Sequence, residues 1–351
     1  MSTVRVGIIG VGGIANGRHI PELLQVKDCK ITAICDINKN ALNAVGDKLG
    51  LDEEHRFTDY KDLIKCADVD AVEVCTPNYL HIPMAAEAVS AGKPINVEKP
   101  LSTDLLHTKE LKEALEKNPV PNMMCFSYRF FPAVRFAKWI LEKNMIGDIV
   151  SIDVQYLKSS AFDEGRRLDW RFVKEYAGTG VLGDLGVHLI DMAEFLVGKI
   201  NAVSASTGIV VKERKKIGSE EIGKVETDDF CNFIADIEGG VSGTFVITRC
   251  AIGNANTIKF DVFGTDGVIS FNLNNPNVLS VCIGEVDKKG NGLHTVTVPG
   301  QFKITQEQMF INMVNGKPCK YLPTVEDGMR AQNILDSLLL SSEEKRWVNI
   351  K

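Results

Sequence analysis

A glycine-rich turn follows the first apolar run of the chain, Val4–Ile9. It consists of Gly10, Val11, Gly12, Gly13, Ile14 and Ala15, and residues with helical spacing come next. In a dinucleotide-binding turn the first glycine allows the tight bend, the second lets the backbone approach the pyrophosphate, and a small third residue lets helix and strand pack closely. The N–H groups at the helix start then face the anion. This glycine turn, Gly10–Ala15, therefore predicts a bound dinucleotide, although an ordinary tight turn would use similar residues.

An acidic residue, Asp36, closes the second apolar run, roughly 20 residues after Ala15. A carboxylate there can accept hydrogen bonds from both hydroxyls of the adenosine ribose, and it repels the 2′-phosphate of NADP. We therefore expect NAD as the cofactor rather than NADP, with Lys39 nearby leaving some tolerance of NADP. The alternative is that Asp36 only caps the following helix.

Two residues that can handle protons, Asp184 and His188, lie four positions apart in a predicted helix over about Asp184–Leu196, so both share one face. Imidazole titrates near neutral pH, which makes His188 a candidate general base that Asp184 could orient. Two structural readings compete, because Asp184 could cap the helix and His188 could be a core histidine. A metal site that includes Asp191 is a third reading. We expect no metal, because no further His or Cys lies at ligand spacing.

A lysine, Lys99, follows the predicted strand Pro94–Val97 at the carboxyl edge of the sheet, where open α/β folds bind ligands. Its ammonium group could donate a hydrogen bond to a reacting oxygen and stabilise the negative charge that develops there. Pro100 restricts Lys99 to an extended backbone, which helps to aim the side chain. The alternative at a strand end is a solvated lysine.

The elements that must position these residues alternate between short apolar runs and helical patterns over residues 1–125. This rhythm is typical of a parallel sheet that is buried on both faces and has right-handed connections. The predicted strands are Val4–Ile9, Lys30–Cys35, Ala71–Cys75, Pro94–Val97 and Asn122–Phe126, and the predicted helices are Ile14–Val26, Asn40–Leu49, Tyr60–Lys65, Leu80–Ala91 and Asp104–Lys117. We therefore predict an α/β protein whose N-terminal domain is a doubly wound Rossmann sheet.

The rhythm changes near residue 126, which we take as the start of a second domain, 126–351. Helices are predicted over Pro132–Lys143 and Thr324–Leu340, in addition to the one that carries His188. Alternating runs joined by Gly- and Asn-rich turns indicate a mostly antiparallel sheet, with strands at Ile149–Leu157, Phe230–Ile237, Val241–Arg249 and Thr257–Phe263. The mixed-charge segment Lys212–Glu226 is predicted to be a solvated loop or hairpin tip.

Composition narrows the class of protein. A length of 351 residues suggests about two domains, and a hydrophobic fraction of 44% with 25% charged residues is typical of a globular protein. The net charge of −6 provides no general attraction to nucleic acid. No signal peptide and no apolar stretch near the ~20 residues of a membrane span is evident, so we expect a cytoplasmic protein without a membrane partner. The nine cysteines contain no C-x-x-C pair and are expected to be buried thiols.

Five ordered motifs extend the pattern over essentially the whole chain. They are the glycine turn, Cys75-Thr76-Pro77-Asn78 with His81, Glu98-Lys99-Pro100, Tyr128-Arg129-Phe130 with Pro132, and the run Gly183–Asp191. Together they resemble the oxidoreductase family that contains glucose–fructose oxidoreductase and inositol dehydrogenase (Gfo/Idh/MocA).

The resemblance implies that the Rossmann domain is followed by an α/β domain with a large open sheet, often used for subunit contact, and hence a homodimer or homotetramer. It implies reversible hydride transfer between NAD and a secondary alcohol of a sugar or cyclic polyol. It also implies that Lys99, Asp184 and His188 are catalytic and contact the substrate. Thr76, Pro77, Asn78 and His81 are expected around the nicotinamide ribose, with Asn78 as a helix cap the alternative. Glu98 and Lys99 are also expected to contact the cofactor.

Further contacts to the substrate are expected from Arg129, Lys158, Asp169 and Trp170. The run DEGRRLDWRF, which contains the last two, resembles a variable loop of the family that ends in tryptophan. Charged and aromatic groups suit a ligand rich in hydroxyls, because they supply planar hydrogen bonds and an apolar platform for C–H faces. Each of these charged residues could equally form a surface ion pair.

Two other functions fit the same motifs. One is a non-catalytic dinucleotide sensor that regulates a partner, because a fold does not fix a function. The presence of Lys99, Asp184 and His188 together argues against it. The other is a glycoside hydrolase that uses bound NAD for a transient oxidation, as the resemblance also allows.

Overall fold

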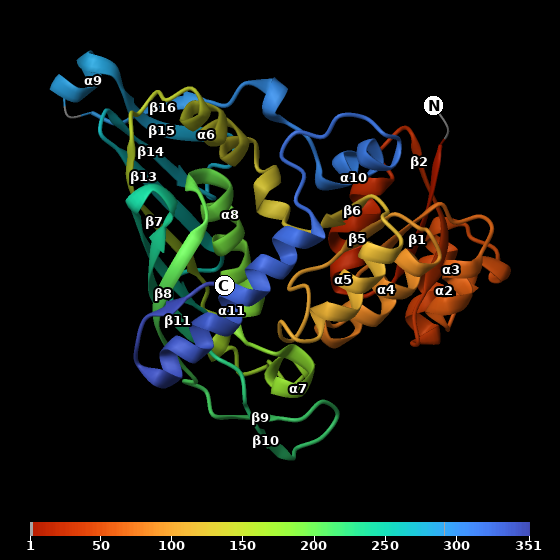
Figure 1. Cartoon of the computed structure of the whole chain (residues 1–351). Coiled ribbons are helices and arrows are strands. Elements are labelled where there is room, and N and C mark those ends of the chain that lie inside the picture. The colour runs from red at the N-terminus through yellow and green to blue at the C-terminus, as the bar shows by residue number, and fades with distance from the viewer. Residues whose placement is uncertain (1–2, 291) are drawn as a thin grey trace. The chain divides into compact units, whose positions relative to one another are not determined.

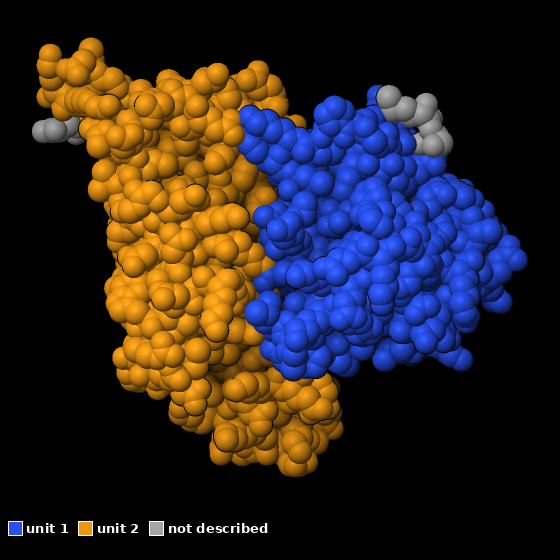
Figure 2. Space-filling view, in the orientation of Figure 1, with its two compact units in different colours: residues 1–125, 304–329 blue, residues 126–303, 330–351 orange. Residues whose placement is uncertain are grey.

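The structure is a computed structural model that describes residues 3–290 and 292–351. It divides into two compact units, which Figure 2 colours separately. Unit 1 extends to Cys125 and also contains Ile304–Met329, whereas unit 2 contains Phe126–Lys303 and Arg330–Lys351. Unit 1 thus includes a late segment, 304–329, that the sequence pattern assigned to the second domain.

Unit 1 is built on a parallel sheet with the strand order β3-β2-β1-β4-β5-β6 (Figure 1). The strands are β1 Val4–Ile9, β2 Cys29–Cys35, β3 Arg56–Phe57, β4 Ala71–Val74, β5 Ile95–Val97 and β6 Asn122–Met124. The predicted doubly wound sheet is confirmed, and its order reverses between β1 and β4, where such folds bind ligands. The two-residue strand β3 was missed because it is too short to show a pattern.

The longer helices of unit 1 connect its strands. They are α2 Lys39–Leu49, α3 Tyr60–Lys65, α4 His81–Ser90 and α5 Thr108–Lys117, with single turns at η2 Glu53–His55 and η3 Asn78–Leu80. The helix predicted over Ile14–Val26 begins as a π turn, η1 Ala15–His19, and continues as α1 Ile20–Leu23. Such π turns occur frequently at functional sites.

The segment 304–329 joins unit 1 through helix α10, Gln306–Val314. Thr305 caps this helix by accepting a hydrogen bond from the Gln308 N–H at 3.1 Å, and Phe310 is fully buried. Beside β6, the Met124 N–H donates to the Pro323 carbonyl at 2.9 Å. A pattern read along the chain does not reveal this return, because it depends on contacts between segments about 200 residues apart in sequence, such as Asn122 with Val325.

Unit 2 is built on a nine-stranded sheet with the order β16-β15-β14-β13-β7-β12-β11-β8-β17. Only β7 and β12 pair in parallel, so the prediction of a mostly antiparallel sheet is confirmed. The strands are β7 Ile149–Leu157, β8 Ile200–Gly208, β11 Phe230–Ile237, β12 Val241–Thr248, β13 Thr257–Gly264, β14 Gly267–Asn272, β15 Val278–Ile283, β16 His294–Thr297 and β17 Val348–Asn349.

Helices cover one face of this sheet (Figure 1). Helix α6, Pro132–Glu142, packs on β14 and β15, and α8, Val187–Val197, packs on β7. The strands alternate buried and exposed residues, as a sheet with one covered face requires. The other elements are η4 Ser127–Phe130, η5 Ser160–Phe162, η6 Trp170–Phe172, α7 Lys174–Ala177, η7 Leu182–Gly186, η8 Glu238–Gly240, α9 Gly284–Gly290, η9 Gly300–Phe302 and α11 Val325–Glu344.

A separate two-stranded hairpin, β9 Glu213–Lys215 with β10 Ile222–Lys224, forms the segment that was predicted to be a loop or hairpin tip. The nine cysteines are free thiols, four of them buried and five half-buried. No helix in the described part of the chain is long and apolar enough to cross a membrane.

Replacing Phe310 with alanine tests the attachment of α10 to unit 1. We expect a loss of about 3–5 kcal/mol in the free energy of unfolding, because the substitution leaves a cavity in a fully buried site. Urea unfolding followed by circular dichroism measures it. The control is Gln308→Ala, at a half-buried position of the same helix, with an expected change of about 0.5 kcal/mol. Equal losses in the two variants would contradict the burial of Phe310.

Candidate active site

The glycine turn has the geometry of a phosphate-binding turn. Gly10 has a φ of +91°, and a Cβ there would lie 2.8 Å from the Cys75 carbonyl oxygen, so only glycine fits. A Cβ on Gly12 or Gly13 would meet nothing within 4 Å, which leaves room beside the backbone for a cofactor. Ala15 is fully buried where the helix packs on the strand. These observations fit a dinucleotide pyrophosphate at this turn.

Asp36 is fixed at the end of β2, next to the glycine turn. Its Oδ2 accepts a hydrogen bond from the Val11 N–H at 3.0 Å, and its Oδ1 accepts one from the Asn38 N–H at 2.8 Å. Helix α2 is capped by Asn38, whose side chain accepts from Asn40 and Ala41. Asp36 is therefore not the cap residue of α2, and its carboxylate is fixed beside the glycine turn.

The loops after β4 and β5 are joined by His81, which is fully buried. Its Nδ1 and Nε2 each lie 2.8 Å from a carbonyl oxygen, of Pro100 and of Thr76 respectively. Burial lowers the pKa of His81, although both carbonyls oppose the effect. His81 thus shapes the predicted cofactor loop, Thr76 to Asn78. Asn78 lies inside η3 and Pro77 is the flanking residue, so the predicted alternative that Asn78 caps a helix is not observed.

Glu98 holds the backbone of Lys99. Its Oε2 accepts a hydrogen bond from the Lys99 N–H at 3.0 Å, and its Oε1 lies 3.0 Å from Nε2 of His19. The Lys99–Pro100 peptide bond is cis. Because His19 ends the π turn that follows the glycine turn, this contact connects the predicted cofactor turn to the lysine at the end of β5.

A buried cluster surrounds the other nitrogen of His19, and sequence reasoning missed it. Nδ1 of His19 lies 2.9 Å from Oε1 of Glu307 and 3.3 Å from Oε2 of Glu73. All three side chains are fully buried. Asn96 donates from its Nδ2 to Glu73 at 3.2 Å and to Glu307 at 3.4 Å. We call His19, Glu73, Glu98 and Glu307 the His19 cluster; a charged residue inside the apolar run AVEVC was the signal that could have revealed it.

The protonation of this cluster follows from its burial. Burial alone would lower the pKa of His19, but the surrounding acidic groups raise it well above its usual value. Burial, together with Glu73, raises the pKa of Glu307 to about 8. Burial would also raise the pKa of Glu73, but the charge of His19 and hydrogen bonds outweigh it and lower that pKa. At neutral pH the cluster therefore holds an imidazolium, an ionised Glu73 and a protonated Glu307.

The His19 cluster also contains sets that could reach one metal ion, His19 with Glu73 and Cys75 or with Glu98 and Cys125. Both imidazole nitrogens already face carboxylates at contact distance. Nε2 is hydrogen-bonded to Glu98, whereas Nδ1 lies at ion-pair distance from Glu73 and Glu307.

In unit 2, His188 lies in the first turn of α8 and is 5% exposed. The ring of Tyr128 stacks on its imidazole with centroids 4.2 Å apart, and the hydroxyl groups of Tyr128 and Tyr156 lie 2.6 Å apart. Burial, Tyr128 and the charge of Asp184 all raise the pKa of Tyr156, which places Asp184 near this group. Asp184 is an exposed residue of η7, whose cap residue is Val181, so the predicted capping role for Asp184 is not observed.

Arg129 and Asp191 form a buried ion pair. The guanidinium donates from Nε to both Asp191 oxygens at 2.9 and 3.0 Å and from Nη2 to Oδ1 at 2.6 Å. Arg129 is 7% exposed and lies 5.2 Å from the centroid of the Phe195 ring. These contacts favour a role for Arg129 in holding α8, and they occupy the carboxylate of Asp191 that a metal would have needed.

The remaining predicted substrate residues lie in two loops. Lys158 follows β7, and its Nζ lies 5.4 Å from the centroid of the Tyr156 ring. Tyr156 in turn contacts Tyr128, whose ring stacks on His188, so Lys158 lies near these residues. Asp169 accepts a hydrogen bond from the Arg171 N–H at 2.8 Å and caps η6, which begins at Trp170. Burial and Arg249 lower the pKa of Arg166, whereas the charges of Asp169 and Asp184 both raise it. Because Asp184 acts on Arg166, the loop that contains Arg166 and Asp169 lies near η7.

The strand order of unit 1, the glycine turn after β1 and the acid at the end of β2 define a dinucleotide-binding Rossmann domain. In agreement, residues 4–126 match the model of an oxidoreductase family with an NAD-binding Rossmann fold. Residues 134–270 match the model of the GFO/IDH/MocA C-terminal domain. The chain belongs to the Gfo/Idh/MocA family of oxidoreductases.

Proteins similar to this chain include dehydrogenases of sugars and polyols. Levoglucosan dehydrogenase of Pseudarthrobacter phenanthrenivorans is 31% identical over 328 residues, which cover 85% of this chain and 84% of that protein. Myo-inositol 2-dehydrogenase of Thermotoga maritima is 27% identical and covers 99% of both chains. A solved structure of levoglucosan dehydrogenase in complex with NADH and levoglucosan matches with a TM-score of 0.88, 29% identity and 99% of both chains covered.

The His19 cluster predicts a stability that falls as pH rises. The pKa of Glu307 is about 8 in the folded protein and has its usual value of 4.5 in the unfolded chain, so the folded state retains a proton that the unfolded state releases. Stability therefore falls as pH rises between these two values. The raised pKa of His19 acts in the same direction above neutral pH. Glu307→Gln mimics the protonated side chain. We therefore expect its free energy of unfolding to fall less steeply between pH 6 and 8, by up to about 1.4 kcal/mol per pH unit.

Urea unfolding at a series of pH values measures these slopes. The control is Glu110→Gln on α5, because Glu110 is exposed. Parallel slopes for wild type and Glu307→Gln would show that Glu307 does not carry the extra proton.

Proposed function

We propose that the protein is an NAD-dependent dehydrogenase that transfers a hydride between the nicotinamide and a secondary alcohol of a sugar or cyclic polyol. The observation that carries this proposal is the chain of contacts from the glycine turn through His19 and Glu98 to Lys99. It fixes a cationic residue at the carboxyl edge of a dinucleotide-binding sheet. The names of the relatives, levoglucosan dehydrogenase and myo-inositol 2-dehydrogenase, support the substrate class.

Within this proposal, each residue has a definite task. NAD, when bound, supplies the hydride acceptor. The Lys99 ammonium donates a hydrogen bond to the reacting oxygen and stabilises its developing negative charge. His188 accepts the hydroxyl proton, with its imidazole kept in place by the stacked Tyr128. Asp184 binds a second hydroxyl or orients His188.

The other predicted residues contact the cofactor or the substrate. The glycine turn takes the pyrophosphate and Asp36 the adenosine ribose, while Thr76, Pro77, Asn78 and Glu98 surround the nicotinamide ribose. Lys158, Asp169 and Trp170 contact the sugar. Arg129 supports α8 through Asp191.

We also propose that the protein works in the cytoplasm as a homodimer or homotetramer. The face of the unit 2 sheet opposite the helices is the proposed subunit contact. On this face Ile234 and Phe263 remain 46% and 36% exposed, which supports its use as an interface.

Lys99→Ala tests the role of the ammonium group. We expect kcat to fall by about 100-fold or more on the best substrate of a panel of inositols and hexoses, because a main source of transition-state stabilisation is removed. NADH affinity should stay within about threefold of wild type, because the lysine acts on the substrate. NADH formation measured by absorbance gives the rates, with Lys109→Ala on α5 as the control.

An unchanged kcat would remove Lys99 from the mechanism. Tight NAD binding without turnover on any polyol would indicate a sensor instead. Release of a leaving group without net NADH would indicate a hydrolase.

Asp36→Asn tests the choice of cofactor. The amide keeps a hydrogen-bond acceptor near Val11 but loses the charge that repels a 2′-phosphate. We expect the ratio of kcat/KM for NAD to that for NADP to fall by about 10-fold. Steady-state kinetics with both cofactors measure it, with the exposed Asp52→Asn as control. A ratio equal to wild type would show that Asp36 does not select the cofactor.

A further inference from the structure

The hairpin β9–β10 belongs to a longer segment, 209–227, which includes the mixed-charge stretch Lys212–Glu226 that was predicted to be a solvated loop or hairpin tip. One of its side chains, Arg214, is instead 7% exposed. The guanidinium donates from Nη2 to the Ala161 carbonyl at 2.5 Å and from Nη1 to the carbonyls of Arg166 and Asp163 at 3.1 and 3.3 Å. A single buried side chain therefore holds three backbone carbonyls of one loop. The guanidinium suits this task because its donors are spread over separate nitrogens in a fixed plane, whereas the donors of a lysine all lie on one nitrogen.

The same loop, 160–172, is bound to segment 209–227 along its whole length. Three further hydrogen bonds link the two stretches. They are Leu168 N–H to the Lys215 carbonyl at 2.8 Å, the Thr227 hydroxyl to the Arg171 carbonyl at 2.9 Å, and Glu226 N–H to the Phe172 carbonyl at 2.9 Å. The loop that contains Asp169 and Trp170 therefore depends on segment 209–227 for its shape.

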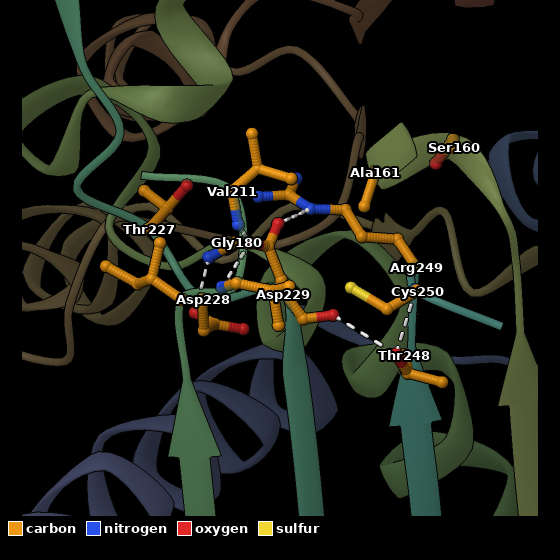
Figure 3. Close-up of polar contacts among 12 residues, drawn as sticks. Ser160, Ala161, Gly180, Val211, Thr227, Asp228, Asp229, Thr248, Arg249 and Cys250 are labelled. Carbon is orange, nitrogen blue, oxygen red and sulfur yellow. Dashed lines mark hydrogen bonds and ion pairs between the residues drawn. The ribbon is translucent and has the colours of Figure 1, made fainter. Parts of the chain in front are cut away.

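A fully buried ring, Phe172, forms the centre of this arrangement. The guanidinium carbons of Arg166, Arg214 and Arg249 lie 4.8, 4.7 and 4.8 Å from its centroid. Arg249 donates from Nε to Oδ1 of Asp229 at 2.5 Å. Figure 3 shows this pair and, beside it, Val211 of the segment, whose N–H donates to Oδ2 of the same carboxylate at 2.9 Å. Asp229 thus ties the base of the segment to the arginines that pack on Phe172.

The neighbouring residue, Asp228, holds the turn that carries Asp184. It accepts a hydrogen bond from the Gly180 N–H at 2.6 Å (Figure 3). It accepts another from the Leu182 N–H at 2.9 Å. The approach is so close that a Cβ on Gly180 would lie 2.0 Å from the Asp228 carbonyl oxygen. Two adjacent aspartates therefore fix segment 209–227 on one side and η7 on the other.

From these contacts we propose that Arg214 is a positioning residue for sugar binding, and that segment 209–227 supports sugar affinity by setting the shape of loop 160–172. Arg214 holds loop 160–172 in the shape that presents Asp169 and Trp170 to the substrate. The proposal rests on the proposed dehydrogenase function, because that function makes the loop a substrate loop.

Arg214→Met tests it, with Arg167→Met as the matched control. Methionine keeps an unbranched apolar stem and removes all donors to the loop. Arg167 belongs to the same loop, but its guanidinium is partly exposed. It makes only a long hydrogen bond to the Ser219 carbonyl at 3.4 Å and a solvent-exposed ion pair with Glu220 at 3.6 Å, contacts that contribute little. Two measurements are made on each protein: amide hydrogen exchange of residues 160–172, which needs no turnover, and steady-state kinetics on the best sugar of the panel at saturating NAD.

For Arg214→Met we expect faster exchange in the loop, a KM for the sugar raised by about 10-fold or more, kcat within about threefold, and unchanged NADH affinity. Thr227→Val, a nearly isosteric change that removes the single hydrogen bond to Arg171, should shift exchange and KM in the same direction by a smaller factor. Arg167→Met should resemble wild type. The valine variant keeps the test decisive if Arg214→Met does not fold.

Faster loop exchange with an unchanged sugar KM would overturn the proposal, and so would unchanged exchange in both variants. A parallel loss of NADH affinity and sugar affinity would also overturn it, because that result indicates a general structural role. If wild type turns over no polyol, the proposed function fails. Hydrogen exchange with and without a saturating polyol then decides separately whether the loop binds the sugar.

Discussion

The contact between the imidazole of His19 and the carboxylate of Glu98 is the constraint on which the catalytic arrangement of unit 1 depends. His19 ends the π turn after the glycine turn, and Glu98 holds the backbone of Lys99, so the cofactor turn and the lysine are fixed relative to each other. The opposite side of the imidazole meets Glu73 of β4 and Glu307 of α10. Because three carboxylates share one imidazolium, the cluster retains a proton, and this makes the attachment of segment 304–329 sensitive to pH.

Unit 2 also contains buried carboxylates that fix neighbouring segments. Asp228 and Asp229 precede β11 and accept backbone N–H groups from η7 and from segment 209–227. A buried carboxylate is costly unless donors surround it, so each of these residues specifies one arrangement of its neighbours rather than simply adding stability. The stacked Tyr128 and the Arg129–Asp191 pair hold α8 in a similar way. The proposed catalytic groups thus lie on rigid elements supported by buried polar contacts.

Local features of the fold and site were predictable from the sequence. The glycine turn, Asp36 and the apolar runs of the Rossmann sheet depend on neighbours in the chain, and the structure places them as expected. The partners of His19 were not predictable, because Glu307 lies 288 residues away and reaches unit 1 only through the return of segment 304–329. The burial of Arg214 was not predictable for another reason. Arg214 lies in the charged run KERKK, and the sequence does not distinguish a buried arginine from exposed charged residues beside it.

The most direct test of the account is a crystal structure of the protein with NADH and a non-reacting sugar alcohol. The account predicts the pyrophosphate on the N–H groups of the glycine turn, with Nζ of Lys99 and a ring nitrogen of His188 both within about 3.2 Å of one substrate hydroxyl. A sugar hydroxyl that reaches neither group, or NADH bound away from the glycine turn, would contradict it.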